Sequence, residues 1–139
     1  MARHNQILRT GGSTQGADAF IGLHIVGNGI RALDNEVVDT LPGGGSPSFA
    51  IVAGGYPVTV YATSGAVVEG NRLSNTVRHL AGGIVVFATD CLIVNNRITD
   101  MEVGVDFGGS GTGSYRDNLT SGATTPYTGA GGTNAGNNQ

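Results

Sequence analysis

The chain has 139 residues, of which 39% are hydrophobic and 25 are glycine, and it carries a formal net charge of −3 at pH 7. This size predicts one domain, and average glycine usage of about 7% would give only about ten glycines, so we expect many turns and few long helices. The seven basic side chains are all arginines without a cluster, and no apolar run approaches about 20 residues, so we expect neither a nucleic-acid partner nor membrane insertion.

The first residues, MARHNQILRTG, lack the apolar segment of a signal peptide. The localisation stays open, because an extracellular or cell-surface parent protein can lose its leader. Within this stretch, Asn5 and Ile7 match Asn96 and Ile98 of a later segment. We therefore expect the chain to begin inside a repeat.

Four segments share a pattern of short alternating runs separated by small residues. Alternation over about four to six residues predicts strands, and no segment keeps the i, i+3, i+4 spacing of a helix. Three short strands in each repeat describe one turn of a β-solenoid. The segments are GLHIVGNGIRALDNEV from Gly22, PVTVYATSGAVVEGNRL from Pro57, GIVVFATDCLIVNNRI from Gly83 and GVDFGGSGTGSYRDNL from Gly104.

Near its end, each segment has an asparagine that follows Asp, Gly or Asn. Such pairs suit a corner, because these residues tolerate left-handed backbone angles. The aligned asparagines are 36, 25 and 22 residues apart, so one corner varies in length. We predict that their amides stack as a ladder: Asn35, Asn71, Asn96 and Asn118.

Two stretches have the composition of loops. Residues 41–56, LPGGGSPSFAIVAGGY, are predicted to be an insertion between turns. Residues 120–139 contain little to bury and are predicted to be an extended, glycine-, threonine- and asparagine-rich tail. The β-helix domain is accordingly assigned to residues 1–119.

The segments GIVV, LIVNNRIT and SYRDNLTSG resemble the repeat of the pectate-lyase-like superfamily over about residues 20–120. The resemblance implies an all-β fold, a right-handed single-stranded parallel β-helix of about four coils. Many members of this superfamily act on polysaccharides, whereas others are adhesins, surface proteins or modules without known activity. No catalytic motif of the superfamily matches here, so no catalytic residue is carried over.

Alternation separates inward from outward side chains. Cys91 aligns with Ile30 and Ala66, which predicts a small buried side chain without a catalytic role. The inward ladders are Leu23, Val58, Ile84 and Val105; Ile25, Val60, Val86 and Phe107; Ala32, Val68, Ile93 and Tyr115; and Val37, Leu73 and Ile98.

The outward positions include several apolar residues, although a solvated face should be polar. Exposed apolar surface marks an interface, so we expect self-association, and the superfamily resemblance favours a homotrimer. The alternative is a sugar-stacking platform formed by Tyr61 and Phe87. The interface candidates are Val26, Tyr61, Val85, Phe87, Leu33, Val67, Leu92 and Val94.

Charged residues align on the third strand of the repeat, and Glu36 is expected beside Arg72. The simplest interpretation is a solvated ladder of ion pairs and turns, and a carboxyl pair such as Asp100 with Asp106 or Glu102 has no distinctive spacing. The three histidines lack metal-ligand spacing, so no metal, cofactor or catalytic residue is predicted. We expect a structural or interaction module, with a carbohydrate-binding or polysaccharide-cleaving module as the alternative. The weak polar-face candidates are Glu36, Arg72, Arg97, Asp39 and Asp100.

Overall fold

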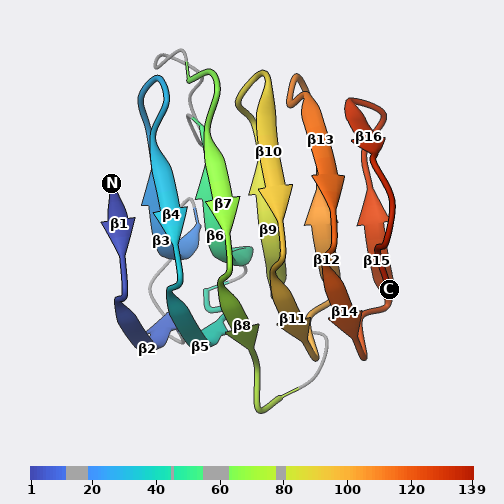
Figure 1. Cartoon of the computed structure of the whole chain (residues 1–139). Coiled ribbons are helices and arrows are strands. Elements are labelled where there is room, and N and C mark those ends of the chain that lie inside the picture. Colours follow the sequence, from blue (N-terminus) through green and yellow to red (C-terminus); the bar gives the residue numbers. More distant parts are fainter. Residues whose placement is uncertain (12–18, 45, 55–62, 78–80) are drawn as a thin grey trace.

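The computed structural model describes residues 1–11, 19–44, 46–54, 63–77 and 81–139. In these ranges the chain forms short strands joined by turns, and each strand pairs in parallel with strands from neighbouring turns of the chain. The predicted all-β parallel β-helix is confirmed (Figure 1). The strands are β1 (Ala2–Arg3), β2 (Gln6–Gly11), β3 (Phe20–Ile25), β4 (Arg31–Leu33), β5 (Glu36–Leu41), β6 (Ser48–Ala53), β7 (Val67–Glu69), β8 (Arg72–Ser74), β9 (Gly82–Val86), β10 (Cys91–Val94), β11 (Arg97–Thr99), β12 (Val103–Asp106), β13 (Gly113–Arg116), β14 (Leu119–Ser121), β15 (Thr125–Thr128) and β16 (Gly132–Asn134).

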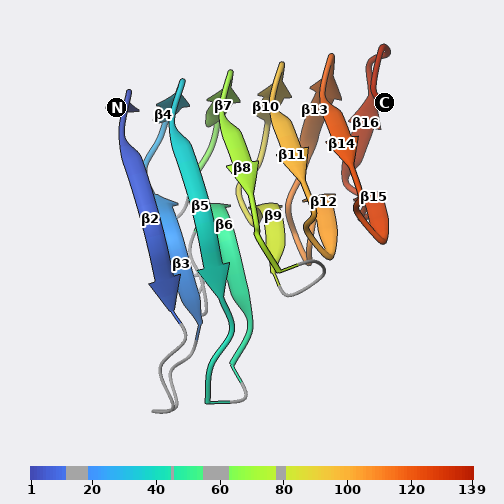
Figure 2. The same cartoon turned by 90° about the horizontal axis from the view of Figure 1, so that it is seen from below.

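The strands stack into three sheets, because each turn of the chain adds one strand to each sheet. Sheet A has six strands in the order β1-β4-β7-β10-β13-β16, sheet B has five in the order β14-β11-β8-β5-β2, and sheet C has five in the order β15-β12-β9-β6-β3. Sheet A lies in front of sheet C in Figure 1, and sheet B forms the lower edge that faces the viewer in Figure 2. The stack therefore has five to six turns, more than the four expected.

The segment 41–56, predicted to be an insertion loop, contains strand β6. This strand pairs with β3 and β9, with Ile51 between Leu23 and Ile84. Ala50 and Ile51 are consecutive, yet both belong to the core. Two adjacent inward residues break the period-two alternation, and this irregularity hides the strand from a pattern search. Val58 and Val60, predicted inward in its place, lie outside the described residues.

The segment predicted to be a tail also forms strands, β15 and β16, which add a last turn to sheets C and A. Tyr127 anchors this turn, since its ring stacks on Tyr115 at a centroid distance of 4.9 Å and its hydroxyl donates to the Asn118 carbonyl at 3.0 Å. A terminal turn covers only one neighbour, so small and polar residues suffice to form it.

The core is filled by the inward ladders. The register of the strands in sheet A confirms one predicted ladder, with Ala32 beside Val68, Val68 beside Ile93, and Ile93 beside Tyr115. Cys91 is buried as predicted, and desolvation raises the pKa of its thiol to about 11. The thiol therefore stays protonated at neutral pH and behaves as a small apolar group.

The asparagine ladder is confirmed, and it extends one rung beyond the predicted residues at each end. In every rung Nδ2 donates to the Oδ1 of the next asparagine at 2.9 to 3.1 Å, and the backbone N–H donates to the same oxygen. The residue preceding each ladder asparagine has a positive φ, between 52° and 68°, which explains the choice of Asp, Asn, Gly and His there. The rungs are Asn5, Asn35, Asn71, Asn96, Asn118 and Asn138.

The ladder closes differently from the way it begins. At Asn138, the Nδ2 group donates to Oδ1 of Asn134 at 2.7 Å, where an inner rung would meet the next asparagine. Asn134 Oδ1 also accepts the Gly136 N–H at 2.9 Å. A side chain of the same turn thus supplies the acceptor that ends the ladder.

Candidate functional site

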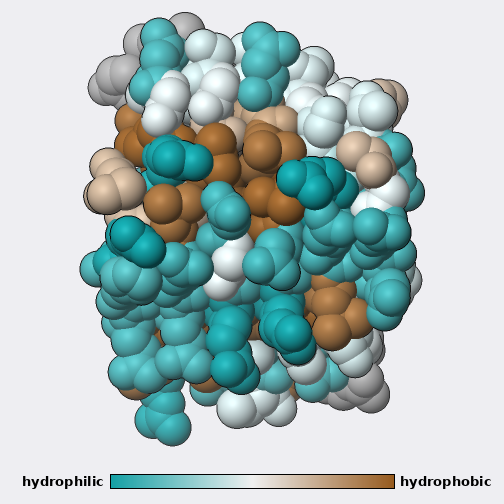
Figure 3. Space-filling model, in the orientation of Figure 1, coloured by the Kyte–Doolittle hydropathy of each residue, from teal (hydrophilic) through white to brown (hydrophobic). Residues whose placement is uncertain are grey.

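The outer face of sheet A carries four of the predicted interface residues. Register places Val67 beside Leu92, and Glu69 between Leu33 and Val94. Figure 3 shows a hydrophobic area over β4, β7 and β10 that is interrupted by hydrophilic residues. We define the sheet A patch by its members: Leu33, Val67, Leu92 and Val94, with Arg31 and Glu69 among them.

The apolar members of the patch differ in exposure. Leu33, Val67 and Leu92 are half-buried, whereas Val94, which we expected to be exposed, keeps only 7% of its surface accessible. Val94 lies in register between Glu69 and Arg116, and such long side chains cover apolar neighbours with their stems. The accessible apolar surface therefore comes from the other three side chains.

Two charges in the patch are unpaired. Arg3 lies 3.5 Å from Asp34, and Arg116 contacts Asp117 at 2.7 Å, so two arginines near the patch already have carboxylate partners. Among the described residues, neither the Arg31 guanidinium nor the Glu69 carboxylate makes an ion pair or side-chain hydrogen bond. The patch thus presents one free positive and one free negative charge.

Three of the other interface candidates, Val26, Val85 and Phe87, belong to the region of sheet C, so the predicted residues do not form one surface. Val85 was expected to be exposed but is 3% accessible, lying between Val52 and Asp106 in register. Val26 and Phe87 are half-buried beyond the ends of β3 and β9, and a Cβ at Gly108 would lie 3.4 Å from the Phe87 ring. Tyr61 lies outside the described residues.

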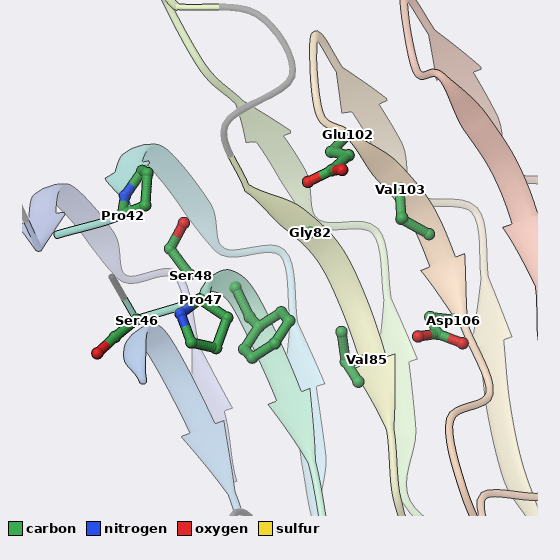
Figure 4. Close-up of a pocket in the computed structure, with 10 residues that line it drawn as sticks. Pro42, Ser46, Pro47, Ser48, Gly82, Val85, Glu102, Val103 and Asp106 are labelled. Carbon is green, nitrogen blue, oxygen red and sulfur yellow. The ribbon is translucent and has the colours of Figure 1, made fainter. Parts of the chain in front are cut away.

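A groove of about 490 Å³ lies on the outer face of sheet C (Figure 4). Phe49 is in register with Gly82, and a Cβ at Gly82 would lie 2.9 Å from Phe49 Cδ1. The missing side chain of Gly82 therefore gives the ring room to lie across β9. The lining consists of Pro42, Ser46, Pro47, Ser48, Phe49, Gly82, Val85, Glu102, Val103 and Asp106.

The two carboxyl groups of the groove come from the two ends of β12. Burial raises the pKa of the Asp106 carboxyl above its ordinary value, as in many catalytic acids. Glu102 directly precedes β12 and Asp106 is the last residue of this strand, so about 13 Å separates their backbones. No group of three or more potential metal ligands of the His, Cys, Asp or Glu type occurs among the described residues.

The outer face of sheet B carries the predicted polar residues. Glu36 is in register with Arg72 as expected, but its carboxylate accepts a hydrogen bond from Gln6 Nε2 at 2.7 Å. Arg72 is in turn in register with Arg97. Two like charges thus stand side by side, an arrangement that destabilises a sheet.

Asp39 lies within β5 and Asp100 directly follows β11, and both have positive φ. The Thr76 N–H donates to Asp39 Oδ1 at 2.7 Å and its hydroxyl donates at 2.8 Å. The backbone N–H of Thr76 is the main reason that the pKa of Asp39 lies below its ordinary value. Asp39 therefore holds the backbone of Thr76, and it does so as a buried side chain rather than as part of a solvated ladder.

Replacing Arg97 with glutamate is expected to stabilise the fold by about 0.5 kcal/mol, because an alternating Glu–Arg–Glu row replaces two adjacent arginines. The free energy of unfolding in urea measures the change, which should shrink at 1 M salt as the charges are screened. Arg116→Glu serves as the control and should destabilise, since Arg116 has a carboxylate partner. A loss of stability in Arg97→Glu would show that the two adjacent arginines do not destabilise the sheet.

Comparisons with protein-family models, with curated proteins and with solved structures found no match. In the described part of the chain, no helix is long and apolar enough to cross a membrane. The parallel β-helix is therefore established from the structure itself. The resemblance to the pectate-lyase-like superfamily rests on the repeat pattern.

Proposed function

We propose that this protein is a structural or interaction module that associates with further copies of itself through the sheet A patch. The observation that carries the proposal is the hydrophobic area over β4, β7 and β10 (Figure 3). Its half-buried members Leu33, Val67 and Leu92 lie on adjacent strands of a rigid sheet. Burying such side chains is the principal source of association free energy.

The size of sheet A limits the strength of this association. Six strands at about 4.8 Å spacing and about four residues of length give a face of about 24 by 13 Å, or roughly 300 Å². A stable interface buries about 800 Å² on each partner. We therefore expect concentration-dependent association with a dissociation constant in the micromolar range or weaker.

Leu92→Asp is expected to abolish self-association, because it places a charge at the centre of the apolar surface. Sedimentation equilibrium between about 10 µM and 1 mM measures the mass of the wild type and of the variant. The matched control is Leu119→Asp, since Leu119 is 38% exposed on sheet B and lies outside the patch. A wild type that stays monomeric over the whole range contradicts the proposal.

A second candidate function is carbohydrate binding in the groove of sheet C. Sugar sites combine an aromatic ring with polar groups that accept hydroxyl hydrogen bonds, and Phe49, Glu102 and Asp106 supply both. Among the described residues, the lining contains two carboxyl groups and no basic side chain, a composition that is unfavourable for anionic polysaccharides. The chemistry of this groove favours a neutral glycan.

Phe49→Ala is expected to remove glycan binding if the groove has this function, because the variant lacks the stacking surface. A glycan array followed by calorimetry on any hit measures it. Phe87→Ala is the control, since Phe87 is another half-buried aromatic residue outside the groove lining. Binding that survives in Phe49→Ala, or an array without hits, counts against this candidate.

A further inference from the structure

The two unpaired charges of the sheet A patch occupy opposite corners of a rectangle. Arg31 is in register with Val67, and Leu33 is in register with Glu69. Arg31 and Leu33 lie on β4, and Val67 and Glu69 lie on β7. Arg31 and Glu69 therefore form one diagonal, and Leu33 and Val67 form the other.

No ion pair closes the charged diagonal within one chain. Neighbouring strands are about 4.8 Å apart and residues i and i+2 are about 6.6 Å apart, so the diagonal measures about 8 Å between backbones. The structure contains no ion pair between Arg31 and Glu69. Both side chains stand on the outer face, and each is available to a partner.

We infer that a second copy of this chain packs face to face on the sheet A patch about a two-fold axis that runs along the Leu33–Val67 diagonal. This inference rests on the proposed self-association and specifies its symmetry. A rotation about that diagonal places Arg31 of one protomer opposite Glu69 of its partner, and Glu69 opposite the partner's Arg31. Leu33 and Val67 lie on the axis and meet their own symmetry mates, and Leu92 lies beside Val67 on the next strand.

The charge pattern favours this dimer over the trimer that the family resemblance implies. In a two-fold interface the same patch meets itself, so one positive and one negative residue on opposite sides of the axis make two reciprocal pairs. A three-fold ring brings two different surfaces together, and the reciprocity of Arg31 and Glu69 would then have no role. Each exposed ion pair adds little affinity, whereas like charges in contact cost several kcal/mol. The two ion pairs therefore determine how the protomers are aligned in the dimer rather than how tightly they bind.

Charge reversal tests the inference. Arg31→Glu and Glu69→Arg are each expected to raise the dissociation constant on the order of 100-fold, because each creates two like-charge contacts. The double variant Arg31→Glu/Glu69→Arg restores both pairs. An equimolar mixture of the two single variants is also expected to dimerise with about the wild-type affinity, since each pair then joins opposite charges. Sedimentation equilibrium gives the constants, and far-ultraviolet circular dichroism confirms that the variants are folded.

Several outcomes overturn the inference, and they are distinguishable from failure of the proposed function. A wild type that remains monomeric contradicts both the two-fold dimer and the proposed self-association. Three other results support self-association but contradict the two-fold register. They are a loss of association in Leu92→Asp without an effect of charge reversal, an equimolar mixture that stays monomeric, and a trimeric mass. Should either reversal unfold the chain, Arg31→Gln and Glu69→Gln replace it, each with an expected weakening of about threefold, and no weakening overturns the inference.

Discussion

Asn96→Ala is expected to lower the free energy of unfolding by about 4 kcal/mol, a large share of the roughly 5 to 15 kcal/mol typical of a domain. Asn96 is fully buried, and its Nδ2 donates to the Val68 carbonyl at 2.9 Å, the Val94 carbonyl at 3.0 Å and Asn118 Oδ1 at 3.0 Å. Its Oδ1 accepts from the backbone N–H and Nδ2 of Asn71. Alanine removes all of these bonds and leaves the buried backbone N–H of Asn71 without this acceptor.

Urea unfolding followed by circular dichroism measures this loss, and Asn5→Ala is the matched control. Asn5 makes the same two bonds to Asn35 Oδ1, but it lies exposed at the end of the ladder. Water can replace its bonds, so the control is expected to cost less than about 1 kcal/mol. Equal losses in the two variants would show that burial of the ladder does not determine its contribution.

Gly83→Ala is expected to destabilise the fold by about 3 kcal/mol through overpacking. A Cβ at this inward position would collide with the carbonyl oxygen of Gly104 in the next turn and lie 2.9 Å from Ile98 Cγ2. Relief requires β9 and β12 to separate, which breaks their pairing. The neighbouring turn thus approaches so closely that only glycine fits.

The adjacent residue provides the control for this experiment. In Gly82→Ala the new Cβ meets the Phe49 ring, a side chain that can rotate away, rather than backbone. We expect a loss below about 1 kcal/mol, together with a changed groove. Thermal unfolding of both variants measures the difference, and a Gly83→Ala protein as stable as the wild type would contradict the packing argument.

The regular features of the fold could be predicted from the sequence. Asparagine at a fixed place in each segment gave the ladder, and alternation around Val68, Ile93 and Ile98 gave the inward positions now found in the core. These residues repeat at every turn, so alignment of the segments averages out local irregularity. Strands β6, β15 and β16 were not predicted, because they depart from that pattern. Strand β6 has the adjacent inward residues Ala50 and Ile51, and the last turn contains small residues.

The candidate site was predictable only in part. Register of Glu36 with Arg72 followed from the alignment, and the same alignment places Arg31 beside Val67 and Leu33 beside Glu69. The register that forms the charged diagonal was therefore predictable from the sequence, although the apolar residues alone do not indicate it. The groove was not predictable, because its Phe49 lies in the unrecognised strand β6 and its shape depends on the distance between elements far apart in the sequence.

The asparagine ladder also has an electrical direction. Each side-chain carbonyl points toward the preceding turn and each amide nitrogen toward the next, so the dipoles of all rungs add, as peptide dipoles do along a helix. Aligned dipoles polarise one another, and each hydrogen bond becomes stronger as the row lengthens. Removal of a middle rung therefore leaves two short rows, in which each hydrogen bond is weaker than it was in the complete ladder. The stability of this solenoid is expected to rise more steeply than linearly with the number of turns.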